Sequence, residues 1–399
     1  MGFFLSKQMN YILLDTEVRY HLLPFTHTRP VADIRCGIMT MRERWELFLN
    51  SKTSSLTVPY LQEVFPCQEA ENRMLINGSL FANAQLTQAI QQLKPNEQLR
   101  QGNVFIAANI APSAELSWDH WAQLTDTFKV ISFEEPIFGL NRIWDIFTQN
   151  ERVINEDFKT LTVGKKSMPI PAYVTAIAPE QIFVAEGAVV NPCIINASKG
   201  PVYIDAGAEI MEGCMLRGPI ALGKNAVLKM GAKIYGATTI GEGCKVGGEV
   251  SNTVFFANSN KGHDGFLGNA VIGEWCNLGA DTNCSNLKNN YDLVKVWDEY
   301  ENKLVNTGMQ FCGLMMGDHS KSGINTMFNT GTVVGVSCNV FGSNFPDKFI
   351  PSFSWGAAGE TEVYAFDKAM ETASRMMERR GIKLKDAEIK MYQHIFDHK

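Results

Sequence analysis

Aliphatic residues recur at every sixth position between Ile204 and Val250. The repeat runs through Ile210, Leu216, Leu222, Leu228, Ile234, Ile240 and Val246. An α-helix repeats every 3.6 residues and an ordinary strand every two, so neither accounts for this spacing. Hexads of this kind are typical of a parallel β-helix, in which each hexad forms one short strand and one corner of a three-sided coil. We therefore predict a parallel β-helix whose interior is filled by these aliphatic side chains.

Hexads also flank this regular run. They begin at Val184 and Val190, and after Val250 they resume with Phe266, Ile272, Leu278 and Cys284. The rhythm breaks over residues 251–265, and we predict that this segment is a loop thrown out of the coil. A second interruption, over residues 289–310, contains two alternating segments that predict a hairpin. Small residues, Cys214, Cys244 and Cys276 among them, lie four places after the aliphatic positions, where a thiol acts as a compact hydrophobe.

The remaining chain predicts two further regions. Residues 9–165 lack hexads and alternate short apolar strands with helices, which indicates an α/β domain. The β-helix is expected over residues 172–350. Residues 351–399 form an extension whose apolar side chains, Phe366, Met370, Ala373 and Met377, have the spacing of an α-helix. The first six residues match the loose myristoylation pattern, and we attribute this short match to chance. We expect the folded part to begin at Met9.

Composition excludes several classes of function. The net charge of −6 argues against nucleic acid as a partner, because phosphate contacts need clustered Lys and Arg. No apolar run approaches the ~20 residues of a membrane span, so no membrane partner is expected. The nine cysteines include no CxxC pair, so the sequence predicts neither a metal site nor a secreted disulfide framework. A cytoplasmic location fits these features.

A motif in the first region gives the first family resemblance. The segment from Leu22 to Pro30 reads LLPFTHTRP, and Asn77-Gly78 follows a later apolar strand. Both resemble elements of sugar-phosphate nucleotidyltransferases, which implies a nucleotidyltransferase-like, Rossmann-like domain. By this resemblance Arg29, Asn77 and Gly78 would bind nucleotide and sugar, with UTP and Mg²⁺ as the implied cosubstrate and metal.

The same region departs from that family at its phosphate and metal contacts. Leu14 to Val18 stand where a Gly-rich loop would cradle a triphosphate. His21, Val31 and Ser79 replace an Arg, a Lys and an Asp of the family pattern. Such losses weaken stabilisation of a pyrophosphoryl transition state. Two interpretations stay open: a retained fold with a weak or inactive site, or an altered site that still works.

The segment after Val250 carries the second resemblance. Lys261 and His263, then Ile272-Gly273, the run Asn277 to Ala280, and Asn286 resemble the acetyltransferase domain of GlmU-type bifunctional enzymes, members of the hexapeptide-repeat acyltransferases. That family implies a left-handed β-helix, acetylation of glucosamine 1-phosphate with acetyl-CoA, uridylylation of the product, and a homotrimer with acyl-CoA in the clefts between neighbours.

The resemblance assigns a role to each matched residue. His263 would take a proton from the amino sugar as general base, because histidine titrates near neutral pH. Lys261 would meet the sugar phosphate, and Asn277 and Asn286 would bind the sugar. Backbone N–H groups of Gly279 or Ala280 would stabilise the oxyanion.

Two departures concern the substrate. Phe266 stands for a Tyr of the substrate site and Leu287 for another, so the identity of the sugar stays open. We expect an N-acetyltransferase acting on an amino sugar phosphate, with possible UDP-sugar pyrophosphorylase activity in the first domain. The alternatives are a nucleotidyltransferase whose β-helix serves trimerisation, and a non-catalytic scaffold that binds a sugar nucleotide.

Overall fold

The computed structural model describes residues 9–68, 70–112, 114–356 and 361–399, so the myristoylation-like start lies outside the described residues. The chain forms two compact units. The first comprises most of the chain up to Asn141. The second runs from Arg142 to the end and also includes two short segments, Leu23–His27 and Arg35–Ile38. Sequence periodicity does not reveal that these two segments pack with the second unit.

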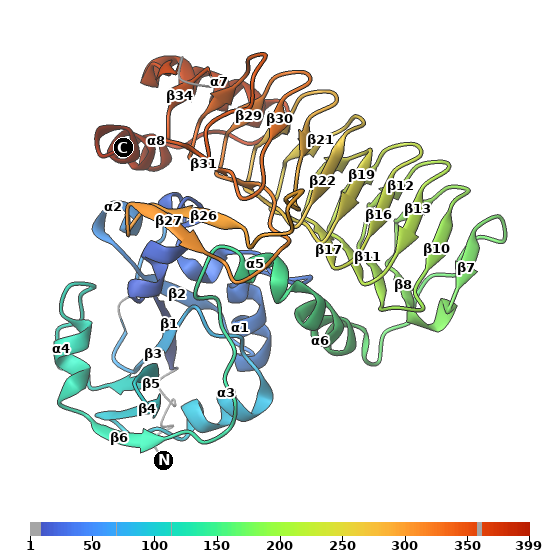
Figure 1. Ribbon diagram of the computed structural model, residues 1–399. Coiled ribbons are helices and arrows are strands. Elements are labelled where there is room, and N and C mark those ends of the chain that lie inside the picture. The colour runs from blue at the N-terminus through green and yellow to red at the C-terminus, as the bar shows by residue number, and fades with distance from the viewer. Residues whose placement is uncertain (1–8, 69, 113, 357–360) are drawn as a thin grey trace. The chain divides into compact units, whose positions relative to one another are not determined.

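The first unit is a mixed six-stranded sheet with short helices, as the alternation of strands and helices predicts (Figure 1). The strand order is β2-β1-β3-β5-β4-β6, in which β5 is antiparallel to both of its neighbours. The strands are β1 (Asn10–Leu14), β2 (Thr53–Leu56), β3 (Arg73–Asn77), β4 (Glu97–Gln101), β5 (Val104–Ile110) and β6 (Lys129–Ser132). The helices are α1 (Met41–Leu49), α2 (Pro59–Gln62), α3 (Ala84–Gln91) and α4 (Trp121–Asp126).

The second unit is a parallel β-helix with three faces, as the hexads predict; its short strands stack in columns in Figure 1. The first face contains β7 (Thr175–Ile177), β10 (Ile194–Asn196), β13 (Met215–Arg217), β16 (Lys233–Tyr235), β19 (Glu249–Ser251) and β22 (Phe266–Gly268), and a separate pair comprises β25 (Asn283–Cys284) and β30 (Met327–Phe328). The second contains β8 (Ile182–Val184), β11 (Val202–Ile204), β14 (Ile220–Leu222), β17 (Thr238–Ile240), β20 (Val254–Phe255), β23 (Val271–Ile272), β28 (Met315–Met316), β31 (Val333–Val334) and β33 (Phe349–Ile350). The third contains β9 (Val189–Val190), β12 (Glu209–Ile210), β15 (Val227–Leu228), β18 (Lys245–Val246), β21 (Asn260–Lys261), β24 (Asn277–Leu278), β29 (Lys321–Ser322), β32 (Asn339–Val340), β34 (Ser354–Trp355) and β35 (Glu362–Val363).

The hexad aliphatics fill the interior of this coil. One turn of the regular region takes eighteen residues, so Leu228 lies in register with Val246. The hexad aliphatics from Ile204 to Val246, and Val250 after them, are all buried in one core cluster. Cys214, Cys244 and Cys276 lie in the same cluster at the small positions, and burial raises the pKa of the Cys244 thiol to about 12. These thiols therefore act as packing groups.

The predicted loop over residues 251–265 is wrong, because the coil continues through this segment as β20 and β21. Ile234, Ile240 and Val246 pair with Val250, Phe255 and Lys261, which shortens these turns to sixteen, fifteen and fifteen residues. The corners are tightened by Asn252 and Asn258, whose φ angles of 45° and 62° lie in the left-handed region. Shorter corners shift the phase of the hexads while the strands persist.

One consequence of the shorter turns is that the inward position moves. Leu267 pairs with Val250 and is buried, while Phe266 pairs with the outward residue Glu249. The assignment of Phe266 to the interior is therefore wrong by one residue.

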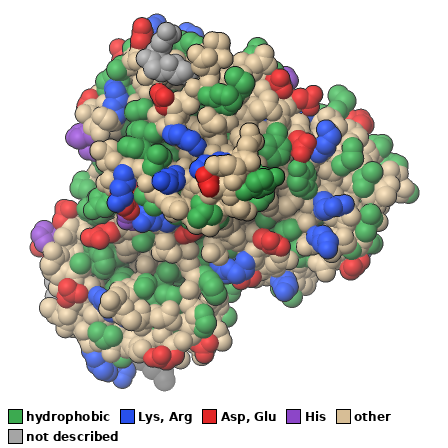
Figure 2. Space-filling model, in the orientation of Figure 1, with side chains coloured by type: hydrophobic (Ala, Val, Ile, Leu, Met, Phe, Trp, Pro, Cys, Tyr) green, Lys and Arg blue, Asp and Glu red, His purple; other side chains and the backbone are tan. Residues whose placement is uncertain are grey.

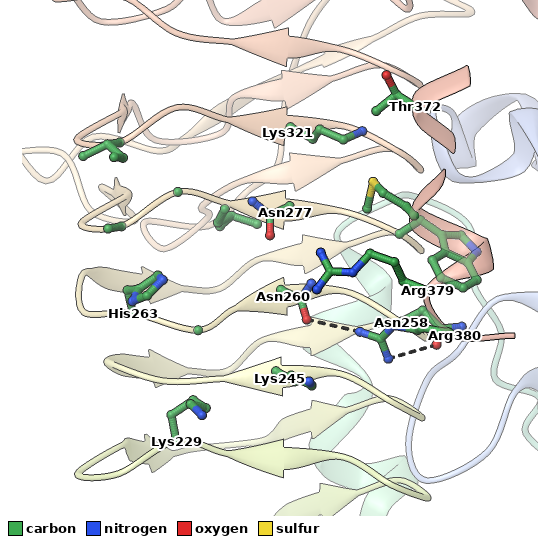
Figure 3. Close-up of a pocket in the computed structure, with 17 residues that line it drawn as sticks. Lys229, Lys245, Asn258, Asn260, His263, Asn277, Lys321, Thr372, Arg379 and Arg380 are labelled. Carbon is green, nitrogen blue, oxygen red and sulfur yellow. Dashed lines mark hydrogen bonds between the residues drawn. The ribbon is translucent and has the colours of Figure 1, made fainter. Parts of the chain in front are cut away.

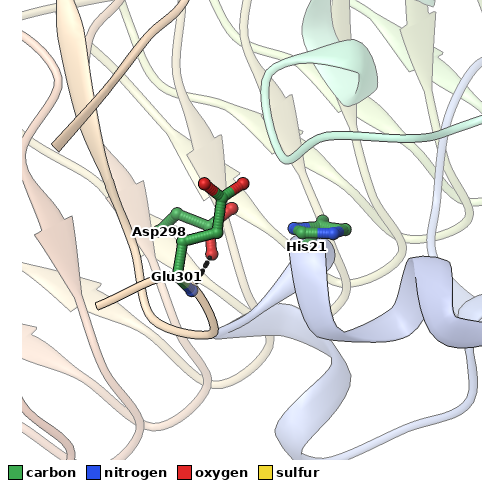
Figure 4. Close-up of side chains that lie close together, drawn as sticks. All are labelled: His21, Asp298 and Glu301. Carbon is green, nitrogen blue, oxygen red and sulfur yellow. Dashed lines mark hydrogen bonds between the residues drawn. The ribbon is translucent and has the colours of Figure 1, made fainter. Parts of the chain in front are cut away.

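The true excursion from the coil is the predicted hairpin, formed by β26 (Lys295–Asp298) and the antiparallel β27 (Lys303–Asn306). Its turn is held by polar contacts within the second unit. The backbone N–H of Glu301 donates to Asp298 Oδ1 over 2.9 Å (Figure 4), and Arg142 Nη1 donates to carboxylate oxygens of Asp298 and Glu301 at 2.5 and 3.0 Å.

Helices complete the second unit. The segment before the coil forms α5 (Asp145–Thr148) and α6 (Asn150–Thr162). The C-terminal extension forms two helices, α7 (Phe366–Glu378) and α8 (Asp386–Asp397), where one was predicted. Every helix among the described residues is too short or too polar to cross a membrane. On the face drawn in Figure 2, Lys and Arg side chains lie among acidic and uncharged ones.

The inward positions predict a large difference between two substitutions. Ile234→Ala should lower the free energy of unfolding by about 2–5 kcal/mol, because it leaves a cavity in the coil. Met230→Ala, at a side chain that is 70% exposed, should change it by no more than about 0.5 kcal/mol. Urea unfolding followed by circular dichroism measures both. Equal losses in the two variants would contradict the assignment of Ile234 to the core.

Candidate functional site

A cavity of about 750 Å³ lies between the third face of the coil and helix α7, both within the second unit (Figure 3). Its walls combine basic, amide and apolar side chains with glycines. The lining residues are Lys229, Lys245, Asn258, Asn260, Gly262, His263, Trp275, Asn277, Leu278, Gly279, Ala280, Lys321, Ile324, Thr372, Met376, Arg379 and Arg380.

The register of the coil stacks the polar side chains of this cavity. Lys245 pairs with Asn260, Asn260 with Asn277, and Asn277 with Lys321. Because parallel strands in register point equivalent residues to the same side, these four form one outward column on consecutive turns (Figure 3). The coil itself therefore builds a polar wall, without a loop.

Glycines keep the surface beside this column flat. A Cβ on Gly247 would lie 2.9 Å from the Gly262 carbonyl oxygen and 3.1 Å from Lys229 Cβ. A Cβ on Gly279 would lie 2.5 Å from the carbonyl carbon of Gly323. Larger side chains here would collide with the backbone of the next turn, so a ligand can approach the corner backbone closely.

The cavity is electropositive. Lys229, Lys245 and Arg379 line it, and none of the three forms an ion pair within the described residues. Lys321 donates from Nζ to the His319 carbonyl oxygen over 2.7 Å, and burial lowers the pKa of Lys321 to about 8. Unpaired cations around one cavity favour an anionic ligand such as a phosphate.

Arg380 fastens the end of α7 to the coil. Its guanidinium donates to the Gly243 carbonyl oxygen and, over 3.3 and 3.2 Å, to the side-chain oxygens of Asn258 and Asn260 (Figure 3). It also lies 5.9 Å from the centre of the Trp275 ring, as a cation–π contact requires. Arg380 thus fixes one wall of the cavity, while its neighbour Arg379 is exposed.

The structure brings four of the predicted residues to this cavity. His263 is exposed at the corner after β21, and Asn277 projects outward from β24 (Figure 3). Gly279 and Ala280 line the same cavity, but they differ in their N–H groups. That of Gly279 donates to the Ser322 carbonyl oxygen over 3.0 Å, so it is occupied by the ladder. Within the described residues the N–H of Ala280 has no acceptor, which leaves it available to an oxyanion.

Lys261 requires a correction. The sequence predicts that its ammonium meets a sugar phosphate, but the side chain is only 1% exposed and points into the coil. It pairs with the inward residue Val246, and the outward neighbour that lines the cavity is Asn260. The shortened turn explains the difference, because it places Lys261 at an aliphatic position.

Phe266 and Asn286 lie outside this cavity. Phe266 is on β22 of the first face, where its ring lies close to Gly268. Asn286 donates from Nδ2 to Asn269 Oδ1 over 2.8 Å, close to the same glycine. The structure thus places these two together and outside the cavity that His263 lines, and their role in substrate binding stays a prediction.

The residues predicted for a nucleotide site lie within the first unit and are engaged in its own packing. Asn77 donates from Nδ2 to the Phe105 carbonyl oxygen over 3.0 Å, and its Oδ1 accepts from Ser79. Gly78 follows at the end of β3, and Arg29 is buried. These hydrogen bonds form a tight turn, which is by itself a sufficient reason for the sequence Asn77-Gly78-Ser79.

The buried carboxylate of Asp15 lies where the related nucleotidyltransferases have a Gly-rich loop for a triphosphate. Asp15 follows β1 and is 1% exposed; its oxygens accept from the Val31 N–H at 2.8 Å, Thr57 Oγ1 at 2.6 Å and Arg19 Nε at 3.3 Å. Burial raises the pKa of Asp15, and the charge of Arg19 and these hydrogen bonds oppose the rise. A carboxylate here repels phosphate oxygens when it is ionised.

Several lining residues were not predicted. Lys229 and Lys245 lie at outward positions that a search for inward hexads ignores, although the eighteen-residue turn would have aligned Lys245 with other outward residues. Trp275, at a corner of the coil, had no sequence signal. Arg379 and Arg380 had none either, because the packing of α7 onto the coil is a tertiary contact.

Comparison with known proteins identifies relatives of both units. Residues 11–166 match the family described as sugar nucleotidyl transferase. GlmU from Methanocaldococcus jannaschii is 30% identical over 244 residues, which cover 58% of this chain and 52% of that protein. The chain is similar to GlmU. A GlmU from Anaplasma marginale is 25% identical over 224 residues, which cover 53% of this chain and 46% of that protein.

Two further comparisons are more limited. A bifunctional sugar-1-phosphate nucleotidylyltransferase/acetyltransferase from Sulfurisphaera tokodaii is 30% identical over 145 residues, 36% of each chain. The Arabidopsis UDP-N-acetylglucosamine acyltransferase structure has a TM-score of 0.22 and 15% identity, and covers 54% of this chain and 78% of that one. The chain spans about half the length of the first GlmU relatives that it matches.

Arg380 provides a test of how the cavity is held. Arg380→Met should detach the end of α7, because the oxygens of Gly243, Asn258 and Asn260 lose their charged donor. Hydrogen exchange should rise at least ~10-fold over residues 374–382, while Arg379→Met, at an exposed side chain, should leave exchange unchanged. Equal exchange in the two variants would contradict the fastening role of Arg380.

Proposed function

We propose that the second unit is an acyl-CoA-dependent acetyltransferase that acts on an amino sugar phosphate in sugar-nucleotide biosynthesis. The observation that carries this proposal is one cavity that combines a histidine, an unoccupied backbone N–H and unpaired cations. His263, Ala280, and the group Lys229, Lys245 and Arg379 supply these features. The similarity to GlmU from Methanocaldococcus jannaschii and to the bifunctional nucleotidylyltransferase/acetyltransferase from Sulfurisphaera tokodaii supports the class of reaction.

The chemistry follows from these groups. His263 accepts a proton from the sugar ammonium, and the resulting amine attacks the thioester carbonyl carbon. A new C–N bond forms as the carbonyl becomes a tetrahedral oxyanion, which the N–H of Ala280 stabilises. The C–S bond then breaks, His263 gives the proton that it holds to the leaving thiolate, and the nitrogen loses its second proton to solvent. The overall reaction converts ammonium and thioester into amide, thiol and one released proton.

The basic residues serve recognition. Both partners of the reaction carry phosphates, which the two ammonium groups of Lys229 and Lys245 and the guanidinium of Arg379 attract. Asn277 offers an amide for sugar hydroxyls on the same wall. We further propose a cytoplasmic homotrimer, in which a neighbouring chain would close the acyl-CoA cleft.

The test of this function is release of coenzyme A from acetyl-CoA with glucosamine 1-phosphate. His263→Ala should lower kcat at least ~10²-fold, the usual scale for loss of a general base. The matched control is His398→Ala, an exposed histidine near the C-terminus, which should retain wild-type turnover. Turnover by wild type that survives in His263→Ala would exclude His263 as the base. Absence of wild-type turnover with this and other amino sugar phosphates would exclude the function.

A second candidate function belongs to the first unit. The family match over residues 11–166 favours nucleotidyl transfer to a sugar, and the sequence resemblance implies UTP and Mg²⁺ for it. Buried Asp15 and the occupied Asn77 oppose it, because neither can receive a triphosphate without rearrangement. A sugar nucleotide-binding unit without catalysis is consistent with both observations.

Pyrophosphate release separates these cases. With UTP, Mg²⁺ and N-acetylglucosamine 1-phosphate, we expect turnover at least ~10²-fold below the acetyl transfer of the same preparation. The reason is that the first unit lacks the charged side chains and the Gly-rich loop that would stabilise the transition state of pyrophosphate release. A coupled phosphate assay measures it. Turnover comparable to acetyl transfer that depends on Mg²⁺ and is lost in Arg29→Ala would overturn this expectation and establish the nucleotidyltransferase.

A further inference from the structure

Lys261 is a cation in the interior of the coil. Its inward column continues through Ile210, Leu228 and Val246 below and resumes at Leu278 above, so its neighbours in register are aliphatic. The side chain is 1% exposed and forms no ion pair within the described residues. An ammonium in such a place costs free energy unless hydrogen bonds compensate it. Packing alone would be better served by an aliphatic residue.

The ammonium is used to hold the backbone of His263. Lys261 Nζ donates to the His263 carbonyl oxygen over 2.9 Å and to the Gly247 carbonyl oxygen over 3.2 Å. Among the described residues no other donor reaches the His263 carbonyl. Gly248 leaves room for the contact, since a Cβ there would lie 2.9 Å from both Lys261 Nζ and His263 O.

We infer that Lys261 is a positioning residue, which orients His263 for catalysis by holding its backbone carbonyl from inside the coil. This inference rests on the proposed function. Only Gly262 separates the two residues, and a glycine provides little restraint of its own. A charge-assisted hydrogen bond to the histidine backbone supplies that restraint. The imidazole is then held at the cavity wall, where a small displacement costs much of the rate.

Electrostatics support the same contact. Burial lowers the pKa of Lys261 to about 8, and the charges of Asp264 and Asp281 oppose this effect. The side chain is therefore protonated at neutral pH and loses its charge as the pH rises through about 8. Since the folded state lowers this pKa, the charge reduces stability at neutral pH, and the penalty falls as the pH rises. A residue kept for stability alone would show the opposite sign.

Lys261→Met separates positioning from structure. Methionine fills the inward site without a charge, so the melting temperature should stay equal or rise at pH 7. The kcat for acetyl transfer should fall about 10- to 100-fold with KM changed no more than about 2-fold. The ratio of wild-type to variant kcat should shrink above pH 8, where Lys261 itself becomes neutral. Leu228→Met, two turns below Lys261 in the same column, is the repacking control and should retain wild-type kcat.

Hydrogen exchange gives a measurement that does not need turnover. In Lys261→Met, exchange should accelerate over residues 262–266 and remain unchanged on neighbouring turns. If wild type is active and Lys261→Met matches it in kcat, the positioning role is overturned. A lower melting temperature with faster exchange along the whole coil would also overturn it, in favour of a structural role. If wild type shows no acetyl transfer, the proposed function fails, and local exchange still decides whether Lys261 holds the corner.

Discussion

The second unit depends on parallel strands that stay in register from one turn to the next. The coil interior admits aliphatic and small side chains, and the same register that buries these residues aligns the outward residues in columns. The column of Lys245, Asn260, Asn277 and Lys321 is a direct result. A binding wall is thus assembled from residues far apart in sequence by the constraint that builds the core.

This constraint explains what the sequence could and could not predict. The repeat from Ile204 to Val246 predicts the coil because its turns have eighteen residues and the hexads keep their phase. Where the turn shortens to fifteen residues, the six-residue spacing is lost although the strands still pair. The sequence therefore predicts a loop where β20 and β21 lie. The hairpin after Cys284 was predicted because its own alternation is independent of the hexads. A search for periodicity detects strands that are regularly spaced, and it misses strands that follow a corner of different length.

The candidate site was predictable only in part, for the same physical reason. His263, Asn277 and Ala280 were found from local motifs on adjacent turns. Arg380 reaches the site through α7, more than a hundred residues later, and its hydrogen bonds to Asn258 and Asn260 are purely tertiary. Lys261 was predicted to bind substrate, but its side chain points into the coil. A change of one residue in register exchanges the inward and outward sets, so residue identity alone could not assign it.

Each unit buries one charge among different partners, and the difference connects energetics to function. In the first unit, Asp15 is surrounded by the donors Arg19, Thr57 and Val31, which stabilise a carboxylate at the place where a phosphate loop was sought. In the second unit, Lys261 has carbonyl partners only, and burial acts against its charge. Burial still raises the pKa of Asp15, so these donors offset its desolvation cost only in part, and they occupy the site with the protein's own groups. At Lys261 the uncompensated cost lies beside the corner that carries the candidate base, and such a cost is intelligible when the contact restrains a reacting group.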